Sequence, residues 1–194
     1  MPNERLNVEL ILASGSAGRW ELLEQAGIPA KVVVSGVAEW ESSDDCPKEQ
    51  CLHNARIKAD AVSKQYPEAL VLAADTIVAL GNTVYHKPVD MDHAWRMFGS
   101  LVGTTHSVWT GVALKCIDKG IDISFCEESK VTLKQMKHED IAELFAKVNP
   151  LDKSGSYAIQ KDDWFIEKIE GSYSNIVGLP LETLAKIFDT LRPF

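Results

Sequence analysis

Residues 69–80 read ALVLAADTIVAL, an apolar run that only Asp75 and Thr76 interrupt. Because polar and apolar residues do not alternate in it, the run is typical of a strand covered on both faces, as in an α/β sheet. Gly81 and Asn82 follow as a turn signal. We therefore expect a buried central strand here, with the rest of the fold arranged around it.

Asp75 is the one charged residue of this run, and it comes where the first apolar stretch ends. In open α/β sheets, ligand-binding side chains gather in a crevice at the ends of strands. A carboxylate there can bind a metal ion or accept a proton. Alternatively, Asp75 and Thr76 only satisfy backbone groups at a strand end. The run alone leaves both interpretations open.

Strands and helices are mixed along the whole chain. Residue periodicity and turn signals predict strands at 8–13, 31–34, 69–80, 108–117 and 121–133, and helices at 19–26, 47–66, 90–98, 139–148 and 181–191. This order predicts an α/β fold with a mixed twisted sheet and flanking helices, forming two lobes around a cleft. No repeat or clear linker divides the chain, so a single domain over residues 1–194 is expected.

Composition narrows the class of protein. Of the 194 residues, 45% are hydrophobic and 25% are charged, which are ordinary values for a globular protein. The net charge of −8 argues against a nucleic-acid surface built on bulk positive charge, but a few converging cations can still bind a small anion. The four cysteines lack zinc-site spacing, and no apolar run is long enough for a membrane span. We expect a cytoplasmic protein with reduced thiols and no membrane contact.

The segment from Ser14 to Arg19 (Ser-Gly-Ser-Ala-Gly-Arg) lies at a predicted strand-to-helix junction. Free backbone N–H groups and the helix dipole favour anions at such a position, so the segment is a candidate phosphate-binding loop. It has neither the Gly-Lys-Ser/Thr ending of a P-loop nor the three glycines of a dinucleotide fingerprint. An ordinary capping turn is the alternative.

Four more residues are candidates for the same chemistry. Lys58 and Lys87 can neutralise phosphate charge near a metal-bound carboxylate, and Glu39 can supply a second hard oxygen ligand. The amide of Gln160 can read the edge of a base, because it both donates and accepts. As isolated residues, all four are equally compatible with solvated surface positions. His86 and His106 have no metal-ligand spacing and are interpreted as structural or surface residues.

Together, these stretches resemble the Maf family of nucleoside triphosphate pyrophosphatases, from about Leu10 to Leu184. The order and spacing of the matching stretches make the likeness specific. In chain order they are Leu12-Ala13-Ser14-Gly15-Ser16 with Arg19, Glu21, Leu22 and Leu23; Lys58-Ala59; Ala74-Asp75-Thr76; Lys87-Pro88; Asp152-Lys153 with Gly155, Tyr157, Ile159 and Gln160; and Gly171-Ser172-Tyr173 with Val177-Gly178-Leu179-Pro180.

The resemblance implies hydrolysis of a nucleoside triphosphate between its α- and β-phosphates, assisted by Mg²⁺, Mn²⁺ or Co²⁺, in a homodimer. The stretch with Gln160 looks like the branch that prefers dTTP and UTP. Asp75 matches the family's catalytic base and can also be a metal ligand, and the sequence leaves open which role it takes. The other implied roles are metal binding for Glu39, phosphate binding for Ser14, Ser16, Arg19, Lys58 and Lys87, and base selection for Thr76 and Gln160.

Three departures from the family pattern affect substrate choice. Ala17-Gly18 stands where the family usually has Pro-Arg, so one guanidinium is missing. Ala38 replaces the first of two usual acidic residues, and 161–164 (Lys-Asp-Asp-Trp) replaces a glycine-rich continuation. Two other hypotheses therefore accompany the enzyme: a nucleotide-binding regulatory protein that has lost turnover, and a housecleaning pyrophosphatase of the inosine-triphosphate type.

Overall fold

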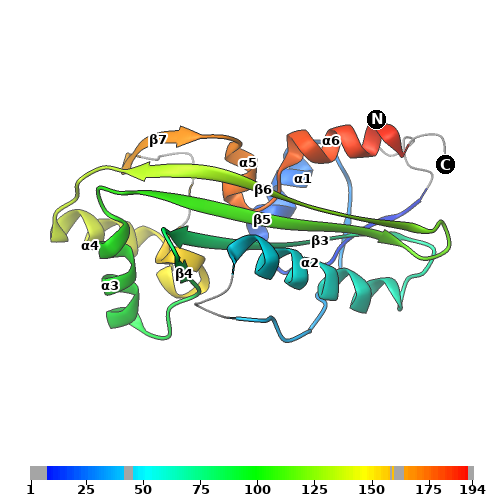
Figure 1. Ribbon diagram of the computed structural model, residues 1–194, viewed down its shortest axis with the longest axis horizontal. Coiled ribbons are helices and arrows are strands. Elements are labelled where there is room, and N and C mark those ends of the chain that lie inside the picture. Colours follow the sequence, from blue (N-terminus) through cyan, green and yellow to red (C-terminus); the bar gives the residue numbers. More distant parts are fainter. Residues whose placement is uncertain (1–7, 42–45, 158, 160–163, 192–194) are drawn as a thin grey trace.

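The computed structural model describes residues 8–41, 46–157, 159 and 164–191. Within these residues, the strands form one seven-stranded sheet, with helices packed against both of its faces (Figure 1). The strands are β1 (Leu10–Leu12), β2 (Lys31–Val32), β3 (Leu70–Leu80), β4 (Thr83–Tyr85), β5 (Thr105–Cys116), β6 (Ile121–Leu133) and β7 (Ile166–Glu170). The helices are α1 (Ala17–Gln25), α2 (Pro47–Ser63), α3 (Met91–Leu101), α4 (His138–Lys147), α5 (Tyr173–Val177) and α6 (Leu181–Thr190), with 3-10 turns η2 (Pro150–Asp152) and η3 (Ser154–Ser156).

The sheet mixes parallel and antiparallel pairs, which confirms the predicted fold class. Its order is β2-β1-β3-β5-β6-β7, with β4 beside β3. The pairs of β1 with β2 and β3 are parallel, whereas β4 to β7 pair antiparallel. All ten predicted elements are present, with ends shifted by a few residues. The short elements β4, β7 and α5 were not predicted, and the residues of α5 were interpreted as loop.

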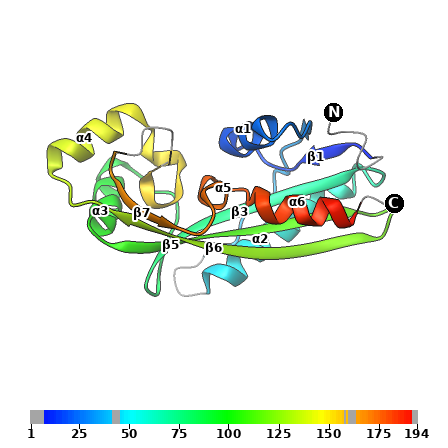
Figure 2. The same cartoon turned by 90° about the horizontal axis from the view of Figure 1, so that it is seen from above.

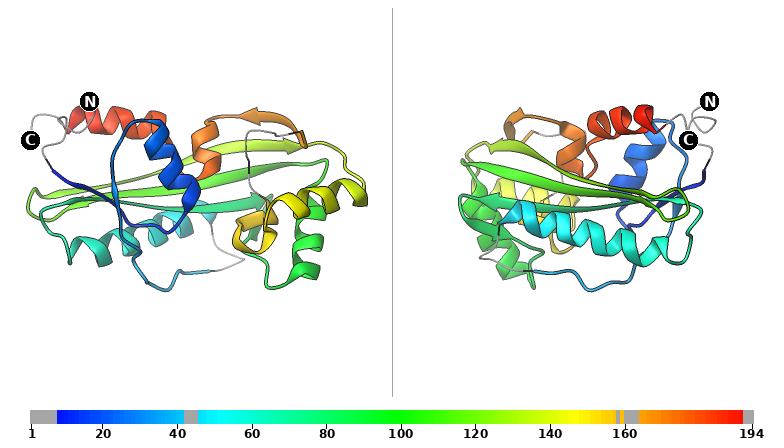
Figure 3. Two further views of the ribbon diagram at one scale, coloured as in Figure 1. Left: turned by 180° about the vertical axis from the view of Figure 1, so that it is seen from behind. Right: turned by 45° about the vertical axis from the view of Figure 1, so that its right-hand side comes forward.

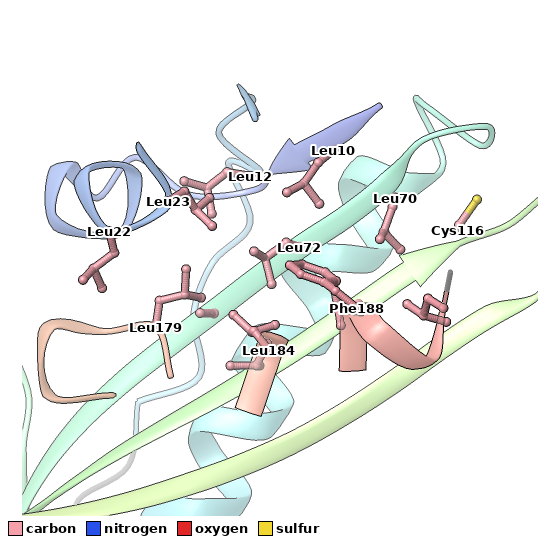
Figure 4. Packing of buried hydrophobic residues seen from close by; sticks show 14 residues of the cluster. Leu10, Leu12, Leu22, Leu23, Leu70, Leu72, Cys116, Leu179, Leu184 and Phe188 are labelled. Carbon is pink, nitrogen blue, oxygen red and sulfur yellow. The ribbon is translucent and has the colours of Figure 1, made fainter. Parts of the chain in front are cut away.

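Alternating side chains of β3 pack on opposite sides of the sheet, as expected for a strand covered on both faces. Leu70, Leu72 and Ala74 belong to the core that α1 and α6 cover, which Figure 4 shows from close by. Val71 and Ala73 pack instead in the core beneath α2. In Figure 2, α1 and α6 lie on one side of the long strands, at the end away from α3 and α4. Asp75 continues the row that faces α2, and Thr76 continues the row that faces α1.

One edge of β3 is interrupted in its middle. The opposite edge pairs continuously with β5 over residues 71–79. On the interrupted edge, β1 pairs only with residues 70–72 and β4 only with residues 78–80. Residues 73–77 therefore have no partner on this side among the strands of the described chain, and the backbone between β1 and β4 is open to side chains and ligands. Asp75 and Thr76 lie in the middle of this gap.

Gly111 brings α2 close to the sheet. It lies opposite Asp75 in the β3–β5 pairing and opposite Cys126 in the β5–β6 pairing. A Cβ atom at this position would overlap the backbone carbonyl of Cys51 on α2. Only glycine lets the helix backbone approach the strand this closely. The distance between α2 and Asp75 thus depends on residue 111.

We predict that Gly111→Ala lowers the free energy of unfolding by about 1–3 kcal/mol, because the new methyl group must displace α2. The measurement is urea denaturation of the wild type and the variant. Gly99→Ala is the matched control, since Gly99 lies in α3, where an added methyl group would meet no described atom of another element within 4 Å. The control should be neutral or more stable by up to about 1 kcal/mol. Equal stability of the two variants would contradict the proposed close contact.

No helix in the described part of the chain is both long and apolar enough to cross a membrane. The four cysteines are free thiols, as expected. The closest pair is Cys51 and Cys126, whose Sγ atoms lie 3.3 Å apart behind the gap in β3.

Candidate active site

A cleft of about 680 Å³ opens at the gap in β3. Figure 3 shows the surrounding ribbon from behind, with α1 and the loop after β1 on one side and the η turns on the other. Every predicted site residue that the structure describes lines this cleft: Ser14, Ser16, Arg19, Glu39, Lys58, Asp75, Thr76 and Lys87. Gln160 and residues 161–163 lie outside the described residues. The two lobes stay a prediction, but the cleft itself is present.

Lys58 lies between the two acidic residues of the cleft. Its Nζ is 2.8 Å from Asp75 Oδ1 and 2.8 Å from Glu39 Oε1, and it also approaches the carbonyl of Ala74 at 3.5 Å. Lys58 and Asp75 are buried, whereas the side chain of Glu39 is 35% exposed. Burial alone would raise the pKa of Glu39, but the hydrogen bond and charge of Lys58 lower it overall, helped by Lys87 and Arg19. Glu39 is therefore held in its charged form.

Arg19 is fixed by three hydrogen bonds to neutral groups. Its Nε donates to the carbonyl of Gly178 at 2.9 Å, and its two terminal nitrogens donate to Ser14 Oγ at 2.9 Å and Thr76 Oγ1 at 3.0 Å. These contacts use three of the five N–H groups of a guanidinium. Burial lowers the pKa of Arg19, while the charges of Asp75 and Glu39 raise it. Arg19 thus provides a buried positive charge with a fixed orientation.

The hydroxyl of Thr76 takes part in a directed chain of hydrogen bonds. Thr110 Oγ1 donates its proton to the carbonyl of Asn175 at 2.9 Å, so it must accept from Thr76 Oγ1, which is 3.0 Å away. Thr76 in turn accepts from Arg19. The chain connects α1, β3, β5 and α5. Thr76 therefore orients Arg19, whatever else it contacts in the cleft.

The loop between β1 and α1 presents the start of a helix to the cleft. Ser16 is the N-cap of α1, and this helix has no side-chain cap hydrogen bond among the described residues. Ser14 Oγ accepts from the backbone N–H of Ser16 at 3.3 Å and from Arg19. Backbone donors, the helix dipole and a guanidinium therefore converge on one spot, which is the arrangement that favours an anion.

The far wall of the cleft is largely apolar. It includes Val78, Val108, Tyr157, Ile159 and Ile176, which is a surface suited to the flat face of a base. The hydroxyl of Tyr157 lies 2.5 Å from Nε2 of His106, a buried residue of β5. Burial lowers the pKa of His106 to about 4, so its imidazole is neutral near pH 7. His106 is a core residue that supports the wall, as its interpretation as structural predicted.

The acidic residues fit a cation that shares its ligands with a substrate. The described residues contain no group of three or more His, Cys, Asp and Glu side chains that could hold a metal by themselves. Mg²⁺ is commonly bound by one or two carboxylates, with phosphate oxygens and water completing its coordination. Asp75 and Glu39, which meet at Lys58, provide this donor set.

Three residues that shape the site were not predicted from the sequence. Asn54 of α2 contacts Asp75, Ser154 of η3 donates to the carbonyl of Thr76 at 3.3 Å, and Thr110 anchors the hydroxyl chain. Asn54 could have been found, because it precedes Lys58 by four residues and must lie on the same face of a helix. Ser154 and Thr110 come from distant parts of the chain and carry no local signal.

The fold and the cleft together define an α/β protein in which buried carboxylates and buried cationic side chains face one opening, a combination suited to a metal-bound phosphate group. The chain belongs to the Maf-like protein family, whose model matches residues 9–191. This confirms the resemblance seen in the sequence over nearly the same range.

Curated relatives of the chain share one name. A dTTP/UTP pyrophosphatase of Bacillus cytotoxicus is 42% identical over 179 residues, which cover 92% of this chain and 93% of the relative. Proteins of the same name from Bacillus cereus and Bacillus anthracis are 41% and 40% identical over the same length, covering 87% and 93% of the relatives. The similarity extends over both walls of the cleft.

Proposed function

We propose that this protein hydrolyses a pyrimidine nucleoside triphosphate of the dTTP or UTP kind to the monophosphate and pyrophosphate. The observation that carries the proposal is the position of Asp75, a buried carboxylate at the open edge of β3 that faces a cleft with two buried cations. Family membership and the names of the relatives support the same reaction. A protein that only binds nucleotide would have no need for a carboxylate oriented in this way.

The reaction adds one water across the α–β phosphoanhydride, so a proton must leave the attacking water and negative charge must be stabilised on the departing pyrophosphate. Asp75 is placed to accept that proton, directly or through an intervening water. Arg19, the loop at Ser14 and Ser16, and Lys87 bind the phosphates and stabilise the leaving charge. Lys58 keeps the two carboxylates charged and close together.

Asp75 and Glu39 are the residues that would hold a divalent cation, Mg²⁺, Mn²⁺ or Co²⁺. When bound, such an ion lowers the pKa of a coordinated water and neutralises phosphate charge. The chain's own contribution is to orient the two carboxylates, and Lys58 balances their charges when the ion is absent. Base selection is assigned to the apolar wall with Thr76 and Gln160. A homodimer in the cytoplasm completes the proposal.

The proposal is tested by incubating the protein with a panel of ordinary and modified nucleoside triphosphates and Mg²⁺, Mn²⁺ or Co²⁺. We expect the highest kcat/KM for dTTP and UTP. A preference for inosine triphosphate would favour the housecleaning alternative. Tight binding without turnover of any substrate would overturn the enzymatic proposal in favour of the regulatory alternative.

Gly18 supplies a prediction about affinity. It lines the cleft beside Arg19, at the position where the family usually carries a second arginine. We predict that Gly18→Arg lowers KM for dTTP roughly tenfold, because one charge-assisted hydrogen bond contributes about 1.5–3 kcal/mol. Steady-state kinetics measure the effect. Gly18→Ala is the control, since its Cβ meets the same Val177 side chain at 3.2 Å without adding charge. If both variants change KM equally, the guanidinium is not the cause.

A further inference from the structure

Asn54 of α2 makes three hydrogen bonds with the two acidic segments of the cleft. Its Nδ2 donates to Asp75 Oδ2 at 3.0 Å and to the carbonyl of Trp40 at 3.0 Å, while its Oδ1 accepts from the N–H of Trp40 at 2.8 Å. The residue is 2% exposed. Both hydrogens of the amide and its oxygen are therefore used, and all three bonds lead to Asp75 or to the residue that follows Glu39.

The contact with Trp40 fixes the backbone beside Glu39. The N–H of Trp40 belongs to the peptide bond that joins it to Glu39, so Asn54 Oδ1 holds the position from which the Glu39 side chain extends. Residues 33–41 form neither helix nor strand, and hence no regular hydrogen-bond ladder holds this segment. Gln50 adds a bond to the same Trp40 carbonyl at 2.7 Å but has no bond to Asp75.

The contact with Asp75 fixes the plane of the carboxylate. Lys58 donates to Oδ1 and Asn54 donates to Oδ2, so each oxygen has one donor and keeps a further lone pair. A neutral amide can hold the second oxygen without adding a positive charge that would repel a cation. The carboxylate is thus oriented while its remaining lone pairs stay available to a ligand.

We infer that Asn54 is a positioning residue that sets the geometry between Glu39 and Asp75, and so determines how tightly the pair binds a divalent cation. The inference rests on the proposed function. Asn54 acts through the two carboxylates and needs no contact of its own with the substrate. Outer residues that orient metal ligands typically contribute 10- to 100-fold in metal affinity or activity.

The test uses Asn54→Leu, which keeps the approximate shape of the side chain and removes its three hydrogen bonds. Asn54→Ala is a second variant, which avoids any clash of the leucine. Mn²⁺ binding is followed by EPR in the presence of a dTTP analogue with a methylene group between the α- and β-phosphates. We expect Mn²⁺ affinity to fall about 10- to 100-fold in both variants. With dTTP, kcat should fall while KM changes by less than about threefold.

Val62→Ala is the matched control for loss of stability. Val62 is buried on the same helix, two turns beyond Asn54, and packs in the core beneath the sheet. It should lower Tm but leave Mn²⁺ affinity unchanged. Wild-type Mn²⁺ affinity in both Asn54 variants, or an equal loss in Val62→Ala, would overturn the inference alone. A wild-type protein that neither binds Mn²⁺ nor turns over dTTP would instead overturn the proposed function.

Discussion

Asp75→Asn is expected to lower kcat by about 10²- to 10⁴-fold while nucleotide binding stays measurable. The change removes the negative charge and the proton-accepting oxygen, and general-base catalysis contributes effects of this size. It also creates a local conflict, because Lys58 and Asn54 donate to the two oxygens of Asp75. Whichever way the new amide is turned, its NH₂ group faces another donor. A modest loss of Tm should accompany the loss of turnover.

Steady-state kinetics with dTTP, together with calorimetric binding of the methylene analogue, separate these two effects. Asp60→Asn is the control, since Asp60 lies on the same helix as Lys58 but forms a partly exposed ion pair with Lys115. It should leave kcat within about twofold of the wild type, as surface ion pairs contribute little. Turnover in Asp75→Asn at the wild-type rate would remove Asp75 from the mechanism.

Arg19→Lys should lower kcat/KM about 100-fold although it conserves the charge. The planar guanidinium reaches Ser14, Thr76 and Gly178 at the same time. A lysine has one nitrogen at the end of a flexible stem, so it can keep only part of this arrangement and points its charge less reliably at a phosphate. A hundredfold loss corresponds to about 2.7 kcal/mol, within the range for one or two charge-assisted hydrogen bonds.

The measurement for Arg19 is kcat/KM for dTTP beside thermal unfolding, because loss of the three bonds also lowers Tm. Arg56→Lys is matched to it. Arg56 lies on the exposed side of α2, where its guanidinium donates to Ser124 Oγ. That variant should retain wild-type kcat/KM. If Arg19→Lys also stays within about threefold of the wild type, the fixed guanidinium is not needed for phosphate binding.

Much of the fold followed from short-range patterns. The apolar run at 69–80 predicted β3, and the alternation within it explains why Asp75 faces α2 while Thr76 faces α1. Asp90 was recognised as a helix cap, and its Oδ1 accepts from the N–H of His93 at 2.6 Å. Elements such as β7 and α5 were missed because their sequences are short or rich in polar and turn-forming residues, and tertiary contacts stabilise them.

The site was predictable as a set of residues but not as a network. Asp75, Lys58 and Glu39 could be named from the sequence, yet the gap between β1 and β4 depends on which strands pair with β3. The bond from Arg19 to Gly178 joins residues 159 positions apart, and no local pattern encodes such a contact. Gly111 was equally hidden, because its role depends on how closely α2 packs against the sheet.

The identity of the bond that is broken tests the proposed reaction most directly. The protein is incubated with dTTP and Mg²⁺, and the products are identified by ³¹P NMR, with heat-treated protein and Asp75→Asn as blanks. We predict dTMP and pyrophosphate in equal amounts. Formation of dTDP and inorganic phosphate would contradict the proposal, because the cleft would then place the β–γ bond, and not the α–β bond, beside Asp75.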